Sequence, residues 1–89
     1  MIPEETLQKN VIDAILLERK RQDDKWGKVK HDPYTWEIIA LEEFGEVAKA
    51  MLEHGNIREE LIQTAAVLVA WLEDEFERGE FENMQEVKA

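Results

Sequence analysis

The chain has 89 residues, a length that allows one domain, residues 1–89, with a small core. Hydrophobic residues make up 44% and charged residues 36%, a balance typical of a globular chain rather than a disordered one. The net charge of −10 argues against binding to nucleic acid or anionic membranes, and the absence of cysteine excludes disulfides and thiolate metal sites. Because no signal peptide or bilayer-length apolar run is evident, we expect a cytoplasmic protein.

Apolar residues recur at helical spacing over residues 4–26, which predicts a first helix there. Gly27 follows as a typical residue just beyond a helix C-terminus. Asp32 and Pro33 then match an N-cap and the proline that is favoured at the first helical position. The second helix is therefore expected to begin at this pair and to run to about Leu52.

Gly55 is expected to end the second helix, and Asn56 with Glu59 matches a capping box for a third helix over residues 57–77. Residues 81–87 would add a short helix. No segment shows the alternation of a β-strand. The predicted fold class is all-α, a helical bundle of three main helices plus a short C-terminal helix.

The segment Ala65–Leu72 is apolar around the whole circumference of the predicted third helix. A helix of this kind has to be surrounded by other elements, which is difficult in so short a chain. We therefore expect a homodimer or homotetramer that completes the bundle around this segment. The alternative is that the first helix and the C-terminal tail cover it within one chain.

Three carboxylates crowd one part of the second helix. Glu43 and Glu46 lie about 60° apart around the helix, and Glu42 and Glu46 about 40° apart. Glu60 and Gln63 share a face of the third helix, and in an antiparallel hairpin the two faces can meet. Carboxylate and amide oxygens are ligands for Mg²⁺, with Mn²⁺ as a possible substitute. The alternative is a solvated acidic face, because glutamate is abundant throughout the chain.

Six of the eleven basic residues fall between Arg19 and Lys30, with Trp26 among them. Basic side chains beside an acidic metal site suit a polyphosphate substrate, and an exposed tryptophan can stack on a base. Arg21 and Lys25 are the candidate phosphate contacts. Simple charge balance for the lysines, and a core or lid contact for Trp26, are the alternatives. Glu18 is expected to point into the bundle, where it needs a basic partner or a place beside the site.

The segments Glu18–Gly27, Glu42–Ala50 and Glu60–Val67 together resemble the MazG-like branch of the all-α nucleoside triphosphate pyrophosphohydrolases, in particular its short stand-alone members from phages and bacteria. The family pattern is Glu-x-x-Glu, a spacer, and Glu-x-x-Asp. Glu43 and Glu46 match the first half, and Glu60 begins the second. Gln63 departs from the pattern, because the family generally has aspartate at that position.

The resemblance implies a dimeric or tetrameric helical enzyme that hydrolyses a nucleoside triphosphate to its monophosphate and pyrophosphate, with Mg²⁺ as cofactor. It also implies that Glu43, Glu46 and Glu60 are metal ligands, and that Gln63 is a weaker neutral one. Glu42 would be a further ligand or would act on the attacking water. An inactive descendant that binds nucleotide or protein, and an acidic mimic of nucleic acid, are alternatives from other functional classes. His31 and His54 are expected at the surface.

Overall fold

The computed structural model describes residues 2–79 of the chain. Within that range the backbone forms three α-helices and no strand: α1 (Glu4–Trp26), α2 (Pro33–Glu53) and α3 (Ile57–Gly79). The prediction of an all-α fold with three main helices is confirmed, and the boundaries of the first helix agree with it. The short helix predicted for residues 81–87 lies outside the described residues.

Local signals in the sequence set the starts of α2 and α3. The carboxylate of Asp32 accepts a hydrogen bond from the Thr35 backbone N–H at 2.9 Å, and this confirms the predicted N-cap. The amide oxygen of Asn56 accepts from the Glu59 backbone N–H at 3.0 Å, which is the predicted half of the capping box. Each bond satisfies a backbone donor that a helix start leaves without an intrahelical partner.

The end of α2 differs slightly from the prediction. The helix ends at Glu53, and His54, rather than Gly55, adopts the left-handed conformation, with φ of 57°. Gly55 follows and donates its N–H to the Ala50 carbonyl at 2.8 Å. A Cβ added to this glycine would lie 3.4 Å from Ala50, which is an ordinary van der Waals contact.

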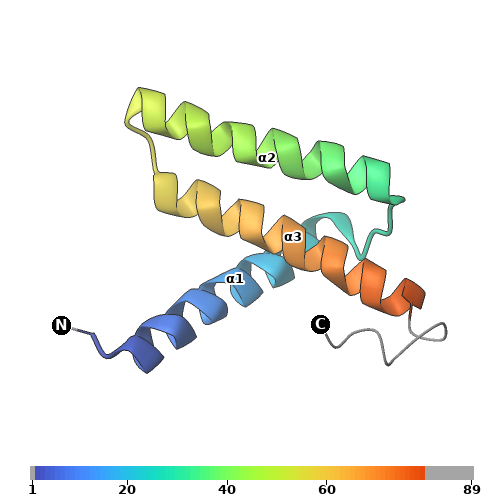
Figure 1. Ribbon diagram of the computed structural model, residues 1–89, viewed down its shortest axis with the longest axis horizontal. Helices are drawn as coiled ribbons and strands as arrows, with labels where there is room; N and C mark the ends of the chain where they lie inside the picture. Colours follow the sequence, from blue (N-terminus) through green and yellow to red (C-terminus); the bar gives the residue numbers. More distant parts are fainter. Residues whose placement is uncertain (1, 80–89) are drawn as a thin grey trace.

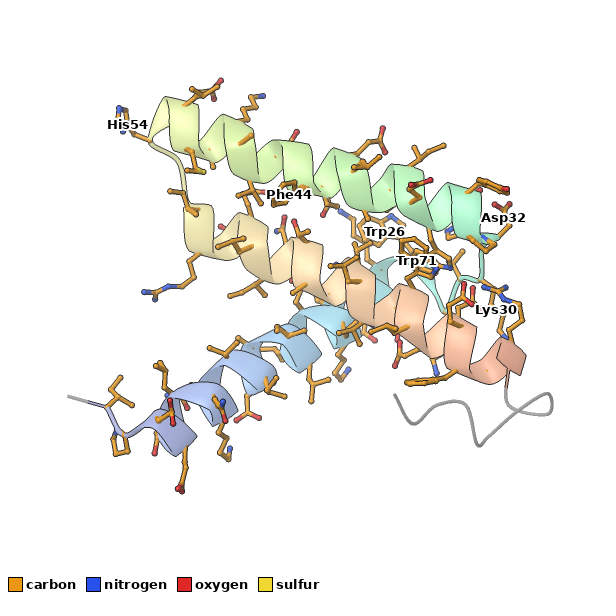
Figure 2. The ribbon with its side chains drawn as sticks, in the orientation of Figure 1. Trp26, Lys30, Asp32, Phe44, His54 and Trp71 are labelled. Atoms are coloured by element: carbon orange, nitrogen blue, oxygen red, sulfur yellow. The ribbon has the colours of Figure 1, made fainter. Side chains whose placement is uncertain are left out.

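The three helices are arranged around α3, which packs against α2 on one side and against α1 on another (Figure 1). Helices α2 and α3 form an antiparallel hairpin. His54 lies at its closed end, and Asp32 and Lys30 lie at the opposite end (Figure 2). Helix α1 crosses behind α3, and its N-terminal half diverges from the hairpin. The loop from α1 to α2 therefore runs beside the C-terminal half of α3.

The core is small and lies between α2 and α3. Trp36, Val47 and Ala50 of α2 are buried, as are Ala66 and Val67 of α3. No large side chain among residues 2–79 is completely buried. Many large apolar side chains stay exposed in the single chain. None of the three helices is both long and apolar enough to cross a membrane, over the residues that the structure describes.

The apolar segment Ala65–Leu72 is only partly covered by the chain itself. Ala66 and Val67 are buried against the neighbouring helices, but Leu68 and Leu72 keep exposed fractions of 42% and 55%. Helix α1 reaches one side of α3 only, so it does not enclose the segment. One chain thus leaves part of this helix open to solvent.

Candidate functional site

Glu43 of α2 is half-buried, and its pKa is affected by the charges of carboxylates on all three helices. Burial is the main reason why the pKa of Glu43 is raised above its ordinary value of 4.5. The negative charges of Glu60, Glu46, Glu18 and Glu42, in decreasing order of effect, raise it further. The negative charge of Glu60 in α3 is thus felt at Glu43 in α2.

Unlike Glu18, the carboxylates that α2 and α3 contribute lack compensating charges in the described chain. Within residues 2–79, none of Glu42, Glu43, Glu46 and Glu60 makes an ion pair. Helix α2 contributes five glutamates and a single cation, Lys49. The acids of α1 and of the C-terminal half of α3, in contrast, are largely paired with lysine or arginine. Negative charge is therefore concentrated at the middle of α2 and the start of α3.

Glu18 connects this cluster to α1. Its carboxylate accepts two hydrogen bonds from the guanidinium of Arg21, at 2.8 and 2.7 Å, and one from the Gln22 side-chain amide at 3.3 Å. The bond from Arg21 is the main reason why the pKa of Glu18 is lowered. Glu18 thus has its basic partner within its own chain. Arg21, a predicted phosphate contact, is engaged with this carboxylate.

Gln63 occupies a different position from the other predicted ligands. It is half-buried and lines a shallow hollow between α1 and α3, together with Glu18, Arg21 and Glu59. The hollow is bordered by both acids and bases. Gln63 therefore lies beside the α1 edge of the carboxylate cluster.

The side chains as they stand do not form a closed metal shell. In the described part of the chain, no three Asp, Glu or His side chains come together closely enough to hold a metal ion. The oxygen donors nevertheless suit Mg²⁺ in type, since this ion prefers carboxylates and commonly retains several water ligands. The uncompensated negative charge around Glu43 also suits a cation.

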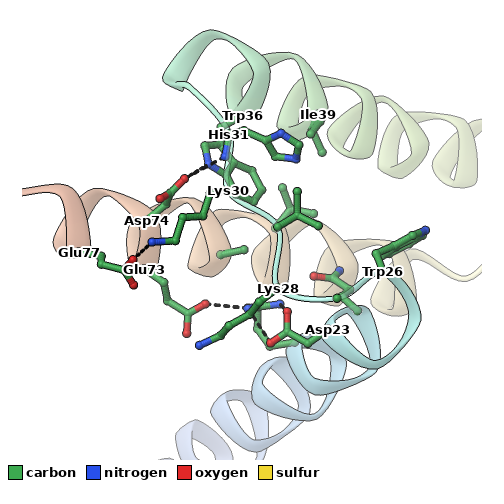
Figure 3. Close-up of a pocket in the computed structure, with 16 residues that line it drawn as sticks. Asp23, Trp26, Lys28, Lys30, His31, Trp36, Ile39, Glu73, Asp74 and Glu77 are labelled. Atoms are coloured by element: carbon green, nitrogen blue, oxygen red, sulfur yellow. Dashed lines mark hydrogen bonds and ion pairs between the residues drawn. The ribbon is translucent and has the colours of Figure 1, made fainter.

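A cavity of about 480 Å³ opens beside this cluster, between the end of α1, the following loop and α3 (Figure 3). Its apolar wall is formed by Trp26, Trp36, Ile39, Val67 and Ala70. Charged residues of the loop and of α3 stand at its rim. Cavities with this combination of aromatic walls and charged rims are typical of sites for small organic ligands.

Register along the helices places the cavity next to the carboxylates. Ile39 lines the cavity one turn before Glu43 on α2, and Gln22 lines it while donating to Glu18 on α1. Trp26 follows Gln22 by four residues, so Glu18, Gln22 and Trp26 lie on the same side of α1. The cavity thus lies about one helical turn from Glu43 along α2, although Glu42, Glu43, Glu46 and Glu60 do not line it.

The two other predicted substrate contacts lie beside this cavity. Trp26 is 60% exposed, and the Lys25 ammonium sits 4.7 Å from the centre of its indole ring. Neither Lys25 nor Lys28, which also lines the cavity, makes an ion pair with any residue from 2 to 79. The other four cations of this basic stretch are all paired with acids of the same chain: Arg19, Lys20, Arg21 and Lys30. This pairing is what simple charge balance predicts.

Asp74 is the buried residue that sequence reasoning missed. Its carboxylate accepts a hydrogen bond from the Trp36 indole N–H at 2.8 Å and from the His31 backbone N–H at 3.1 Å. The His31 ring packs edge-on against Trp36, with ring centres 4.7 Å apart, and His31 is half-buried, whereas His54 is exposed as expected. Asp74 stands in a run of acids between Glu73 and Glu75, so no signal in the sequence distinguished it from its solvated neighbours.

We compared the chain with protein-family models, with curated proteins and with solved structures, and none of the three comparisons gives a match. The likeness to the MazG-like enzymes therefore rests on the residues of the three motifs. Within the described chain, the structure brings Glu43 and Glu60 into the same electrostatic environment and places Trp26 at the adjacent cavity.

Proposed function

We propose that this chain is a Mg²⁺-dependent nucleoside triphosphate pyrophosphohydrolase of the MazG-like type, acting in the cytoplasm as a homo-oligomer. The observation that carries the proposal is the half-buried Glu43, whose pKa is raised by burial and by the charges of carboxylates on all three helices. Like charges held near one another raise the free energy of the fold unless a cation or a proton compensates them. A divalent cation with a triphosphate is the ligand pair that suits such a cluster beside basic side chains.

In this proposal Glu43, Glu46 and Glu60 hold the cation, and Gln63 supplies a neutral oxygen from the α1 edge. A bound divalent cation supplies positive charge that neutralises the phosphate oxygens and favours attack by water. Glu42 orients the attacking water, and an oxygen of the Glu43 carboxylate accepts its proton.

The cavity positions the rest of the substrate. The base stacks on the exposed face of Trp26, and Lys25 and Lys28 approach the phosphates at the rim. Arg21 acts through Glu18, because its guanidinium is already bound to that carboxylate. The charge needed for phosphate binding therefore comes from Lys25 and Lys28, which have no carboxylate partner among residues 2–79.

The test is to incubate purified protein with each ribo- and deoxyribonucleoside triphosphate plus Mg²⁺, and to measure both pyrophosphate and monophosphate. Wild-type protein is expected to release them in equal amounts from at least one substrate. Glu43→Gln is expected to abolish release, while Glu53→Gln, an exposed acid at the end of the same helix, leaves it intact. Absence of pyrophosphate from every substrate at high protein concentration would contradict the proposal.

A second candidate is a non-catalytic helical oligomer that binds nucleotide or protein. The neutral Gln63 and the open carboxylate arrangement in residues 2–79 favour it. Gln63→Asp restores the family pattern, so it is expected to create activity if this candidate is right. If Gln63→Asp binds Mg²⁺ but stays inactive, the absence of the aspartate is not the cause of the inactivity.

A further inference from the structure

The side of α2 that faces away from α3 is apolar along its whole length. At about 100° per residue, the packed face of α2 carries Trp36, Val47 and Ala50. A second row falls on the opposite side of the helix, and it is formed by Tyr34, Ile38, Leu41, Gly45, Ala48 and Leu52. We call this row the outer stripe.

The outer stripe has no cover within the described chain. Tyr34 and Leu52 at its two ends are 79% and 83% exposed, and Leu41 at its middle is 63% exposed. Helix α2 lies along one edge of the molecule, with α3 and then α1 on its other side (Figure 1). A helix that is apolar on two opposite sides is expected to be packed on both.

Charges flanking the outer stripe indicate what covers it. Lys49 is the only cation of α2, and Glu42 precedes it by seven residues, or about 20° around the helix. Both side chains are exposed, and neither is in an ion pair with residues 2–79. One flank of the stripe thus carries one negative and one positive charge, about two turns apart.

We propose that the outer stripe of α2 is the interface for a second copy of this chain, whose α2 packs against it antiparallel about a two-fold axis near Gly45. In such a pairing, the flank that carries Glu42 and Lys49 lies against the same flank of the partner helix. The two helices run in opposite directions, so the order of the two charges is reversed. With the axis between Gly45 and Glu46, Lys49 lies opposite the partner's Glu42, and Glu42 lies opposite the partner's Lys49. The charges beside the outer stripe of one copy are therefore complementary to those beside the outer stripe of the other copy.

The same register also suits the apolar side chains. Leu41 comes level with a point between the partner's Ala48 and the partner's Leu52, so the two rows interleave instead of colliding. The small residues Gly45 and Ala48 lie at the crossing. A side chain placed on Gly45 would meet nothing within 4 Å in the single chain, so the space beside it is open to the partner helix.

This interface would bring a residue of the partner to the candidate site. Glu42 is one of the acids that raise the pKa of Glu43, and the partner's Lys49 would compensate its charge. The inference specifies the oligomer of the proposed function but does not depend on catalysis. Its test uses self-association, so its failure is distinguishable from a failure of the pyrophosphohydrolase proposal.

The first experiment is sedimentation of the full chain over a range of concentrations. Wild-type protein is expected to form a dimer, and Leu41→Glu is expected to raise its dissociation constant by at least about tenfold, because both copies lose an apolar contact. Glutamate keeps a high helix propensity, and circular dichroism checks that the variant folds. Leu68→Glu, in the exposed part of Ala65–Leu72, tests the other interface, which the sequence suggested, and should leave the dimer in place if α2 forms the seam. A monomeric wild-type protein, or a dimer broken by Leu68→Glu but not by Leu41→Glu, would overturn the proposal.

The second experiment tests the register by exchanging charges. Glu42→Lys and Lys49→Glu alone each place like charges opposite one another, so each is expected to weaken the dimer. The double variant restores opposite charges and is expected to recover wild-type association. If the double variant associates no better than the single ones, the antiparallel register is wrong.

Discussion

The indole N–H of Trp36 in α2 donates a 2.8 Å hydrogen bond to the carboxylate of Asp74 in α3. Both side chains are buried, and the same carboxylate accepts the His31 backbone N–H of the preceding loop. This pair therefore joins the open end of the hairpin and fixes the register of α2 against α3. Two turns further along α2, the negative charge of Glu60 in α3 contributes to the raised pKa of Glu43.

Removal of the Asp74 carboxylate should destabilise the fold. Asp74→Ala leaves the Trp36 and His31 donors without their acceptor in a buried place, and we expect the free energy of unfolding to fall by about 2–4 kcal/mol. Urea denaturation measures this change. Glu53→Ala, at an exposed position without an ion pair in the described chain, should change it by less than about 0.5 kcal/mol. Equal effects of the two variants would show that Asp74 does not join the elements.

The attachment of α1 depends on Arg19. Its guanidinium is buried and bonds to Glu73 of α3 at 2.8 Å and to Asp23 at 3.0 Å. Arg19→Met keeps much of the side-chain volume but loses both pairs, so we expect a loss of about 1–3 kcal/mol in the free energy of unfolding. In the same variant, the rate of hydrogen exchange at the α1 backbone amides should rise.

The matched control for Arg19 is the Lys20–Asp24 pair, which has a similar distance of 2.9 Å but is exposed on both sides. Lys20→Met is expected to cost less than about 1 kcal/mol and to leave hydrogen exchange in α1 unchanged. If the two variants behave alike, burial does not strengthen the Arg19 pairs.

The pH dependence of stability should report the carboxylate cluster. In the unfolded chain Glu43 loses its proton near 4.5, and in the folded chain it does so at a higher pH. As pH rises through this window, the unfolded chain therefore ionises first, and the fold loses stability. Without divalent cations, Glu43→Gln is thus expected to raise the melting temperature at pH 7 and to have little effect below pH 4.5.

Glu53→Gln is the control for this titration, since Glu53 is exposed and lies away from the cluster. It should leave the melting temperature unchanged at every pH. If Glu43→Gln raised the melting temperature by the same amount at pH 7 and below pH 4.5, the electrostatic explanation would be contradicted.

The sequence predicted the helices well because their ends carry strong local signals. Asp32 with Pro33, and Asn56 with Glu59, satisfy backbone donors within a few residues of themselves, so neighbouring sequence is sufficient. His54 was missed as the left-handed residue because glycine is the usual choice and Gly55 stood next to it. The tertiary pairs of Arg19 and Asp74 join residues 54 and 38 positions apart. No local pattern specifies such partners.

The candidate site was only partly predictable for the same reason. Helical spacing grouped Glu42, Glu43 and Glu46, and the hairpin brought Glu60 near them. Spacing did not show that Arg21 would be occupied by Glu18, or that Gln63 would line the α1 side of the cluster. Side-chain pairing of this kind depends on how α1 crosses α3. The periodicity of apolar residues in either helix does not specify that crossing.

Calorimetric titration of Mg²⁺ and Mn²⁺ into the wild-type chain, Glu43→Gln, Glu60→Gln and Glu53→Gln is the most direct test that two helices supply one cation site. Saturable binding is expected in the wild type and in Glu53→Gln, and at least about tenfold weaker binding is expected in each of the other two variants. Wild-type protein that binds neither ion, or equal affinity in all four proteins, would contradict the site.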